Sequence, residues 1–270
     1  MEDISRRSFV SLAGGTLAAT LLAACGKKEE EAPAPAAAPE AEPEAAAEPE
    51  QATEQRTVSE GPEDAAGFML LSDAVPDAIQ EIRYFSTYNF VGDRIDGYEQ
   101  PLALITREAG AALRRASDLV IAKGYRLKVF DAYRPQCAVD HFARWAEDLD
   151  DTRMKPYFYP ELDKSVLFDQ GYIDYKSGHT RGSTVDLTLF DMATEREVDC
   201  GGTFDYFGEL SHPDYMDITE EQYQMRMVLR DAMVEAGFMP LPTEWWHFRL
   251  EDEPYPDTYF TFPVNEASVK

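Results

Sequence analysis

Ser177-Gly178-His179-Thr180-Arg181-Gly182-Ser183-Thr184-Val185-Asp186 joins a histidine, a glycine turn and an aspartate that opens a strand. From Ser183 onward polar and apolar residues alternate, which is the period of a half-buried strand. One side of this strand carries Thr184, Asp186 and Thr188, and the side expected to face a core carries Val185, Leu187 and Leu189. Gly182 permits a bend that returns His179 to the Asp186 carboxylate.

An imidazole and a carboxylate that converge at a strand edge are suitable zinc ligands, but a zinc hydrolase also needs a third ligand and a base. Alone, the His-to-Asp spacing is a weak signal, because most such pairs are surface hydrogen bonds or buried polar contacts. The chain has only four histidines, and His247 lies in a second motif, Glu244-Trp245-Trp246-His247-Phe248. That motif offers both the missing ligand and the base.

Residues 1–25 are predicted to be an export signal. Ser5-Arg6-Arg7-Ser8-Phe9-Val10 is a twin-arginine pattern, and an apolar run follows it. The run is too short for a membrane anchor, and Leu22-Ala23-Ala24-Cys25 resembles the lipobox of bacterial lipoproteins. We therefore expect export by the twin-arginine route, a lipid on Cys25 and attachment to the membrane, on the periplasmic side or at the cell surface.

Residues 26–66 are rich in alanine, proline and glutamate and have almost no large apolar side chain. Such a segment buries too little surface to offset its chain entropy, so a disordered acidic tether is predicted. The chain carries a net charge of −26, most of it outside the tether, which argues against a nucleic-acid partner. No protein partner is indicated. Residues 67–270 are expected to form one catalytic domain, with no internal repeat.

The first part of this domain shows a helix, a strand and a second helix. Residues 107–123 are predicted to be a helix that stops at Gly124. Its expected apolar stripe is Ala111, Leu113, Leu119, Val120 and Ala122. Residues 125–132 alternate like a strand, and Pro135 suits the start of the next helix. Arg134 therefore lies at a strand-to-helix corner, a common place for functional side chains.

The last part is predicted to be a helix followed by a strand. Thr219 and Gln222 form a capping box that opens the helix, and Gly237 closes it. Its expected buried stripe is Met225, Leu229, Ala232 and Ala236. In a regular strand Glu244 and His247 point to opposite faces, because they are three residues apart. Either Glu244 belongs to the entering turn or the strand bulges.

The pattern Ser-x-His-x-x-Gly-x-x-x-Asp, followed by Glu-Trp-Trp-His, resembles the zinc D-alanyl-D-alanine dipeptidases of the VanX type. The resemblance runs from about Tyr84 to Pro263 and includes residues 88–92, 96–99, 131–135, 202–205, 211–212 and 252–256. It implies an α+β fold of the hedgehog/D,D-peptidase kind, with a small antiparallel sheet flanked by helices. It also implies zinc-dependent hydrolysis of D-alanyl-D-alanine or close D,D-dipeptides by a metal-activated water.

The resemblance also assigns roles to individual residues. One zinc ion per chain is bound by His179, Asp186 and His247. Glu244 is the catalytic base and Arg134 stabilises the transition state, whereas Ser177, Asp205 and Tyr84 recognise the substrate. Thr184 departs from the family, which usually has alanine beside this aspartate. The lipoprotein leader and the tether are not part of the family pattern.

Other interpretations of the same residues remain open. Judged without the resemblance, Arg134 is a structural partner of a carboxylate, Asp205 and Ser177 are turn or capping groups, and Tyr84 is core. The whole protein has two alternatives: a peptidoglycan D,D-carboxypeptidase or endopeptidase with an open groove, and a non-catalytic zinc module that binds cell-wall peptides. A binding module has no need of a base at position 244.

Two cysteines and two histidines of the expected catalytic domain have no assigned role. Besides Cys25, the chain contains Cys137 and Cys200, and an exported protein permits a disulfide between them. Two free thiols are the alternative. His141 is expected to be structural, and His212 is uncommitted.

Overall fold

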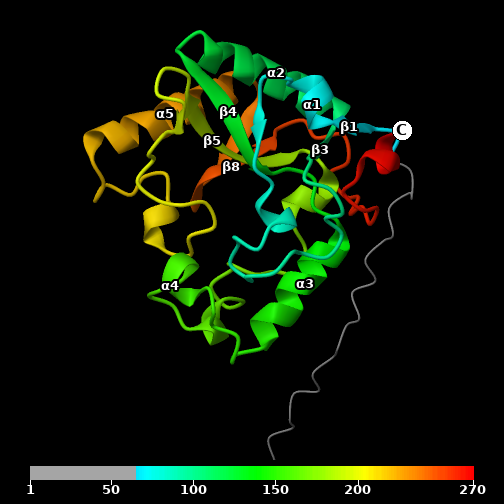
Figure 1. Cartoon of the computed structure of the whole chain (residues 1–270), viewed down its shortest axis with the longest axis vertical. Coiled ribbons are helices and arrows are strands. Elements are labelled where there is room, and N and C mark those ends of the chain that lie inside the picture. The colour runs from blue at the N-terminus through cyan, green and yellow to red at the C-terminus, as the bar shows by residue number, and fades with distance from the viewer. Residues whose placement is uncertain (1–64) are drawn as a thin grey trace, which may run out of the picture. The chain divides into compact units, whose positions relative to one another are not determined.

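The computed structural model describes residues 65–270, which are coloured in Figure 1. The expected signal peptide with Cys25, and all but the last two residues of the expected tether, lie outside the described residues. Ala65 is buried, and its carbonyl accepts a hydrogen bond from the Phe68 amide. Ala65 therefore packs with the domain that was expected to begin at residue 67. None of the helices in this part of the chain combines the length and apolarity that crossing a membrane requires.

The elements are β1 Phe68–Leu70, α1 Leu71–Ala74, β2 Ile79–Gln80, β3 Leu104–Thr106, α2 Arg107–Ile121, β4 Tyr125–Asp131, α3 Gln136–Glu147, α4 Lys155–Phe158, β5 Thr184–Asp191, β6 Arg196–Glu197, α5 Glu220–Glu235, β7 Phe238–Leu241 and β8 Glu244–Leu250. Within residues 65–270 there are also five 3-10 turns: Arg83–Phe85, Lys164–Val166, Gly178–Arg181, Glu209–Ser211 and Glu266–Val269.

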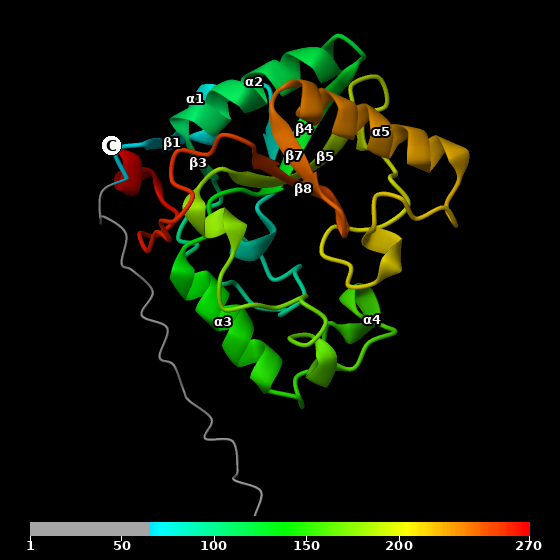
Figure 2. The same cartoon turned by 180° about the vertical axis from the view of Figure 1, so that it is seen from behind.

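The main sheet has the strand order β2-β4-β5-β8-β7, with β6 paired to the end of β5. Its pairs are antiparallel except for the short β2, which runs parallel to β4. A separate antiparallel pair joins β1 and β3. Helices α2 and α5 lie side by side against the sheet, while α3 and α4 lie at the other end of the domain (Figures 1 and 2). The predicted α+β fold with a small sheet is confirmed, with β2 as a parallel addition.

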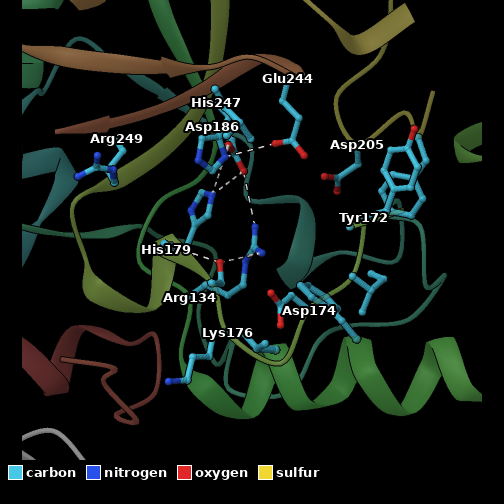
Figure 3. Close-up of a pocket in the computed structure, with 18 of the residues that line it drawn as sticks. Arg134, Tyr172, Asp174, Lys176, His179, Asp186, Asp205, Glu244, His247 and Arg249 are labelled. Atoms are coloured by element: carbon cyan, nitrogen blue, oxygen red, sulfur yellow. Dashed lines mark hydrogen bonds and ion pairs between the residues drawn. The ribbon is translucent and has the colours of Figure 1, made fainter. Parts of the chain in front are cut away.

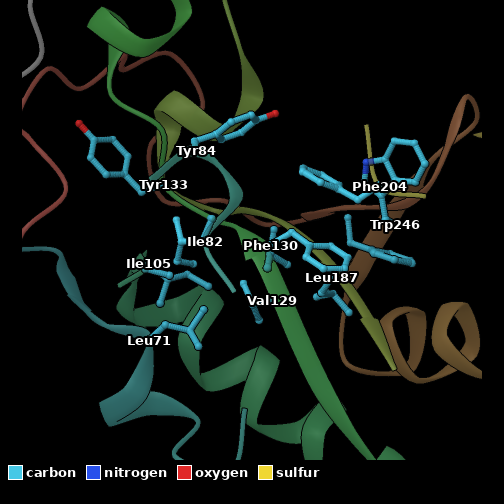
Figure 4. Packing of buried hydrophobic residues seen from close by; sticks show 14 of the residues in the cluster. Leu71, Ile82, Tyr84, Ile105, Val129, Phe130, Tyr133, Leu187, Phe204 and Trp246 are labelled. Atoms are coloured by element: carbon cyan, nitrogen blue, oxygen red, sulfur yellow. The ribbon is translucent and has the colours of Figure 1, made fainter. Parts of the chain in front are cut away.

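Strand β5 is more deeply buried than its alternation predicts. Every residue from Thr184 to Leu189 is buried, including the side with Asp186. Leu187 packs into the apolar core, to which Val129, Phe130, Phe204 and Trp246 also contribute (Figure 4). The polar face is covered because the segments that carry the candidate site fold over it. The Asp186 carboxylate is therefore an interior group, and it needs partners there.

Both long helices begin as predicted, but their buried stripes differ. In α2 the buried apolar positions are Ala109, Ala112, Leu113, Ala116 and Val120, whereas the expected Ala111 and Ala122 are exposed. A stripe that advances 3.6 residues per turn from Ala109 excludes both of them. In α5 the Thr219–Gln222 capping box is present, Met233 is buried and the expected Met225 is only half-buried.

The remaining cysteines and histidines can now be placed. Cys137 is exposed, Cys200 is buried, and both are free thiols, so no disulfide joins them. His141 is structural as expected, since its Nδ1 accepts a hydrogen bond from the Asp96 amide at 3.1 Å. The carbonyl of His212 accepts a hydrogen bond from buried Arg226.

Candidate active site

Three side chains from separate segments converge in the interior (Figure 3). His179 Nε2 lies 3.3 Å from His247 Nδ1 and 3.2 Å from the Asp186 carboxylate. His247 Nδ1 lies 3.1 Å from Asp186 Oδ1. Among residues 65–270 this is the only group of three or more histidine, cysteine or acidic side chains placed closely enough to share a metal ion.

The donor atoms fit a zinc ion. A tetrahedral zinc with bonds of about 2.0 Å has ligand atoms about 3.3 Å apart, close to the spacings observed. Asp186 Oδ1 is buried and lies 3.1 Å from His247 Nδ1, but it accepts no hydrogen bond of good geometry within the described part of the chain, so it is available to a cation. Two imidazole nitrogens and one carboxylate oxygen also match zinc's preferred ligands and leave a fourth position open.

The orientation of His179 is set by the backbone. Its Nδ1 donates to the Ala132 carbonyl at 2.7 Å, which turns Nε2 toward Asp186 and His247. Asp131 lies 3.5 Å from the same Nδ1. The Ser177 hydroxyl accepts a hydrogen bond from the His179 amide and opens the 3-10 turn that carries the histidine.

Gly182 ends this turn with φ of +83°, a left-handed conformation that favours glycine. A Cβ at this position would overlap the Phe68 ring. The bend inferred from the sequence is therefore present, and it leads directly from His179 into β5.

Gly182→Ala is expected to destabilise the metal-loaded protein by about 2–4 kcal/mol, because overpacking adds to the cost of a left-handed alanine. Chemical denaturation together with zinc analysis measures the effect. Gly124→Ala is the matched control, since Gly124 also has positive φ, of +90°, but a Cβ added there would meet no atom within 4 Å. Equal losses in the two variants would contradict the proposed packing constraint.

A bulge in β8 resolves the position of Glu244 relative to His247. Pro240 of β7 pairs with Phe248 of β8, but the next residue of β7, Leu241, pairs with Glu244. A regular antiparallel pair would place His247 opposite Leu241, so residues 245–247 of β8 are extra. The extra residues allow Glu244 and His247 to approach each other, with Glu244 Oε2 3.3 Å from His247 Nδ1. The sequence left a turn or a bulge open, and the structure has the bulge.

The three-residue cluster holds opposite charges in the interior. Burial raises the pKa of Asp186, but the two histidines outweigh it and hold the pKa below its ordinary value. Burial lowers the pKa of His247, but Asp186 and Glu244 outweigh it and raise the pKa to about 9. The surroundings of His247 therefore favour positive charge, which is the environment that a metal cation requires.

Arg134 lies at the predicted strand-to-helix corner, between β4 and α3. Its Nε donates to Asp131 at 3.0 Å, and its NH2 lies 3.4 Å from the Tyr84 hydroxyl and 3.6 Å from Asp186 Oδ2. Its NH1 lies 3.5 Å from Ser177 Oγ. Asp131 holds the guanidinium in place, so Arg134 does have the carboxylate partner that was considered from the sequence. Arg134 also lines the pocket.

Asp205 reaches the pocket from a loop with an unusual backbone. Its φ is +61°, its side chain is buried, and one oxygen accepts a hydrogen bond from the Tyr84 hydroxyl at 2.9 Å. Burial raises the pKa of Asp205 well above its ordinary value, and the charge of Asp186 adds to the effect. A carboxyl group in this position gains from a cationic partner.

Arg226 anchors the loop that carries Asp205. Its buried guanidinium donates to the carbonyls of Cys200 at 2.6 Å, His212 at 2.8 Å and Leu210 at 2.9 Å. These three bonds fix both ends of the loop to α5. The backbone strain at Asp205 is thus supported by contacts outside the pocket.

One pocket of about 450 Å³ is lined by every site residue that the sequence predicted within residues 65–270. Its wall also contains Tyr172, Asp174, Lys176, Arg181 and Arg249, which the sequence did not single out. Asp131 was missed as well, because its ion pair with Arg134 is formed by the corner after β4 and no sequence spacing reports that geometry. The Ala132 carbonyl had no signal, because any residue type supplies a carbonyl.

Comparisons with known proteins found a matching family model and several similar proteins. A family model described as D-ala-D-ala dipeptidase matches residues 64–265. A D-alanyl-D-alanine dipeptidase of Enterococcus faecalis is 40% identical over 74% of this chain and 98% of its own length. One of Streptomyces coelicolor is 39% identical, over 73% and 98% of the two chains.

More distant matches include a D-alanyl-D-alanine dipeptidase of Escherichia coli, 28% identical over 69% of this chain and 86% of its own length. Among solved structures, a zinc-bound mutant of the vancomycin resistance D,D-pentapeptidase VanY aligns with a TM-score of 0.35 and 16% identity. That alignment covers 58% of this chain and 77% of the other.

Proposed function

The chain belongs to the D-ala-D-ala dipeptidase family, and from that premise we propose that it hydrolyses D-alanyl-D-alanine or a close D,D-dipeptide with one bound zinc ion. The observation that carries the proposal is the convergence of His179, Asp186 and His247 beside Glu244 in one pocket. A binding module would not need the carboxylate at position 244.

His179, Asp186 and His247 would hold the zinc ion. When bound there, zinc supplies Lewis acidity, which activates a water molecule and polarises the scissile carbonyl. The Glu244 carboxylate is partly exposed, lines the pocket and lies 3.3 Å from His247 Nδ1. We assign it as the base that takes a proton from the attacking water and delivers one to the leaving amine.

Arg134 is assigned to the negative charge that develops on the scissile carbonyl oxygen. Burial lowers the pKa of Arg134, but Tyr84 and Asp131 outweigh it and raise the pKa, so the guanidinium stays charged throughout. Asp131 fixes its direction before substrate arrives, and such a preorganised donor is typically worth about 3 kcal/mol in the transition state.

Asp205, Tyr84 and Ser177 are assigned to substrate recognition. The Asp205 carboxylate would receive the α-ammonium of a free dipeptide, while the Tyr84 hydroxyl orients that carboxylate. The Ser177 oxygen already accepts from the His179 amide, so its proton remains available to a substrate acceptor.

A D,D-carboxypeptidase is the second candidate function, and one observation favours it. A neighbouring pocket of about 700 Å³ shares Gly171, Tyr172, Phe207 and Glu244 with the candidate site. A longer peptide stem has room to extend there. The buried carboxyl of Asp205 favours the dipeptidase instead, because a longer chain brings no ammonium to that position.

Hydrolysis of D,D-, L,D- and L,L-dipeptides, measured together with metal content, tests the proposed function. D,D-dipeptides such as D-alanyl-D-alanine should be the preferred class of substrate. Metal analysis should find one zinc ion per chain. Chelation should abolish the activity and added zinc should restore it. Full activity in the chelated, zinc-free protein would contradict the proposed mechanism.

We also propose that the protein is exported by the twin-arginine route and attached to the cell envelope through a lipid on Cys25. Cys25→Ser in a bacterial host should block processing or move the protein from the membrane to the soluble fraction. Fractionation with immunoblotting measures this. A wild-type protein found free in the soluble fraction would contradict the lipid anchor.

A further inference from the structure

The pocket carries opposite charges on its two sides. Figure 3 shows Arg249 to the left of His179, Lys176 below it, and Asp205 and Glu244 to the right. The chain has 51 acidic residues and only 25 basic ones, so a basic wall runs against its composition. A D,D-dipeptide is a zwitterion, and Asp205 already accounts for its ammonium end.

Strand register places Arg249 next to the three candidate metal ligands. In the β5–β8 pair, His247 lies opposite Asp186 and Arg249 lies opposite Thr184. Because Arg249 follows His247 by two residues, both side chains emerge on the same face of β8, about 6.7 Å apart along the strand. One residue of substrate, about 3.5 Å long, plus one hydrogen bond of about 2.8 Å, spans a similar distance.

The hydrogen bonds of Arg249 leave most of its guanidinium available. Its NH1 donates to Glu253 at 3.0 Å and to the Leu250 carbonyl at 3.4 Å. Its Nε and NH2 have no acceptor among residues 65–270. These free donors lie in a fork geometry that matches a carboxylate.

Arg181 lines the same pocket but is committed to Glu253. Its Nε donates to both oxygens of that carboxylate, at 3.1 and 3.0 Å, and its NH2 lies 3.0 Å from one of them. Glu253 therefore neutralises Arg181 first and Arg249 only in part. Lys176 adds a further positive charge, since its Nζ lies over the Tyr259 ring at 4.9 Å and has no carboxylate partner in the described part of the chain.

We propose that Arg249 binds the C-terminal carboxylate of the dipeptide and that Lys176 strengthens the attraction. This inference rests on the proposed function and adds a specificity-determining residue to it. With an ammonium site at Asp205 and a carboxylate site at Arg249, the pocket recognises both charged ends of a substrate that is two residues long. Chains extended or capped at either end lose one of these contacts.

The test compares D-alanyl-D-alanine with D-alanyl-D-alaninamide, which keeps the scissile bond and the ammonium but has no carboxylate. The wild-type protein should prefer the acid by at least about tenfold in kcat/KM, as expected for losing a hydrogen-bonded contact between charged groups at a partly exposed arginine. In Arg249→Gln the acid should lose most of that advantage while the amide changes little. Arg249→Lys should restore part of it.

Arg181→Gln is the matched control, because it also removes an arginine that contacts Glu253. Its effect on the acid and the amide should be equal, leaving their ratio as in the wild type. A wild-type protein that cleaves the acid and the amide equally well would overturn the inference and leave the dipeptidase function intact. A ratio that falls in Arg181→Gln or Lys176→Gln but not in Arg249→Gln would also overturn it. Failure to cleave D-alanyl-D-alanine at all would instead refute the proposed function.

Discussion

Glu244→Gln is expected to keep one zinc ion per chain and to lower kcat on D-alanyl-D-alanine by about 10²–10⁴-fold, the usual contribution of a positioned general base. The amide keeps the size and shape of the side chain, so the bulge in β8 and the position of His247 should survive. What is lost is the proton acceptor beside the cluster. Metal analysis and steady-state kinetics on the same sample measure both quantities.

Two comparisons separate this role from ligation and from structure. His179→Ala and His247→Ala should lose zinc and activity together, because each removes a ligand. Glu251→Gln makes the same chemical change at an exposed residue just beyond β8 and should leave both unchanged. A Glu244→Gln enzyme with normal turnover would refute the assignment of Glu244 as the base.

Local sequence signals predicted the elements that carry the site. The capping box at Thr219, the glycine bend at 182 and the corner at Arg134 each depend on a few neighbouring residues, and all three are present. Burial was predicted less well. The face of β5 that carries Asp186 is covered by segments distant in sequence, and no local alternation pattern reports such cover.

The arrangement of the site depends on pairings that the sequence does not encode locally. Glu244 and His247 approach each other because the pairing of β7 with β8 shifts register between Pro240 and Leu241. Arg249 shares the face of His247 because of their two-residue spacing, but only the pairing of β8 with β5 places that face beside Asp186. Motif order identified the ligand set, whereas strand pairing determines which further side chains lie close to it.

Asp205→Asn is expected to lower kcat/KM on D-alanyl-D-alanine by several hundredfold or more, since an unpaired partner of a buried charge pair typically costs several kcal/mol. Asparagine is the informative replacement because it is nearly isosteric and tolerates the positive φ of this position, which alanine does not. Asp174→Asn is the matched control, since Asp174 is an exposed carboxylate that lines the same pocket, and its effect should be small.

Stability distinguishes a lost contact from a damaged fold. Burial raises the pKa of Asp205, so the folded protein binds this proton more tightly than the unfolded chain does. Stability contributed by the protonated group is therefore lost as pH rises from the ordinary pKa through the raised one. The asparagine of Asp205→Asn cannot ionise, so the variant should be as stable as the wild type at low pH and more stable at high pH. Thermal melts of both proteins across this pH range measure the difference.

The ammonium contact also sets the length of the substrate. N-acetylation, or extension into a peptide stem, replaces the charged amine by a neutral amide and leaves the buried Asp205 carboxyl without a cation. The wild-type protein should therefore prefer free D-alanyl-D-alanine over its N-acetyl form by several hundredfold or more. Asp205→Asn should narrow that preference, because it removes the group that distinguishes the two. Comparable kcat/KM on the free and N-acetylated dipeptides would favour the carboxypeptidase, and the neighbouring pocket would then be the natural place for the longer chain.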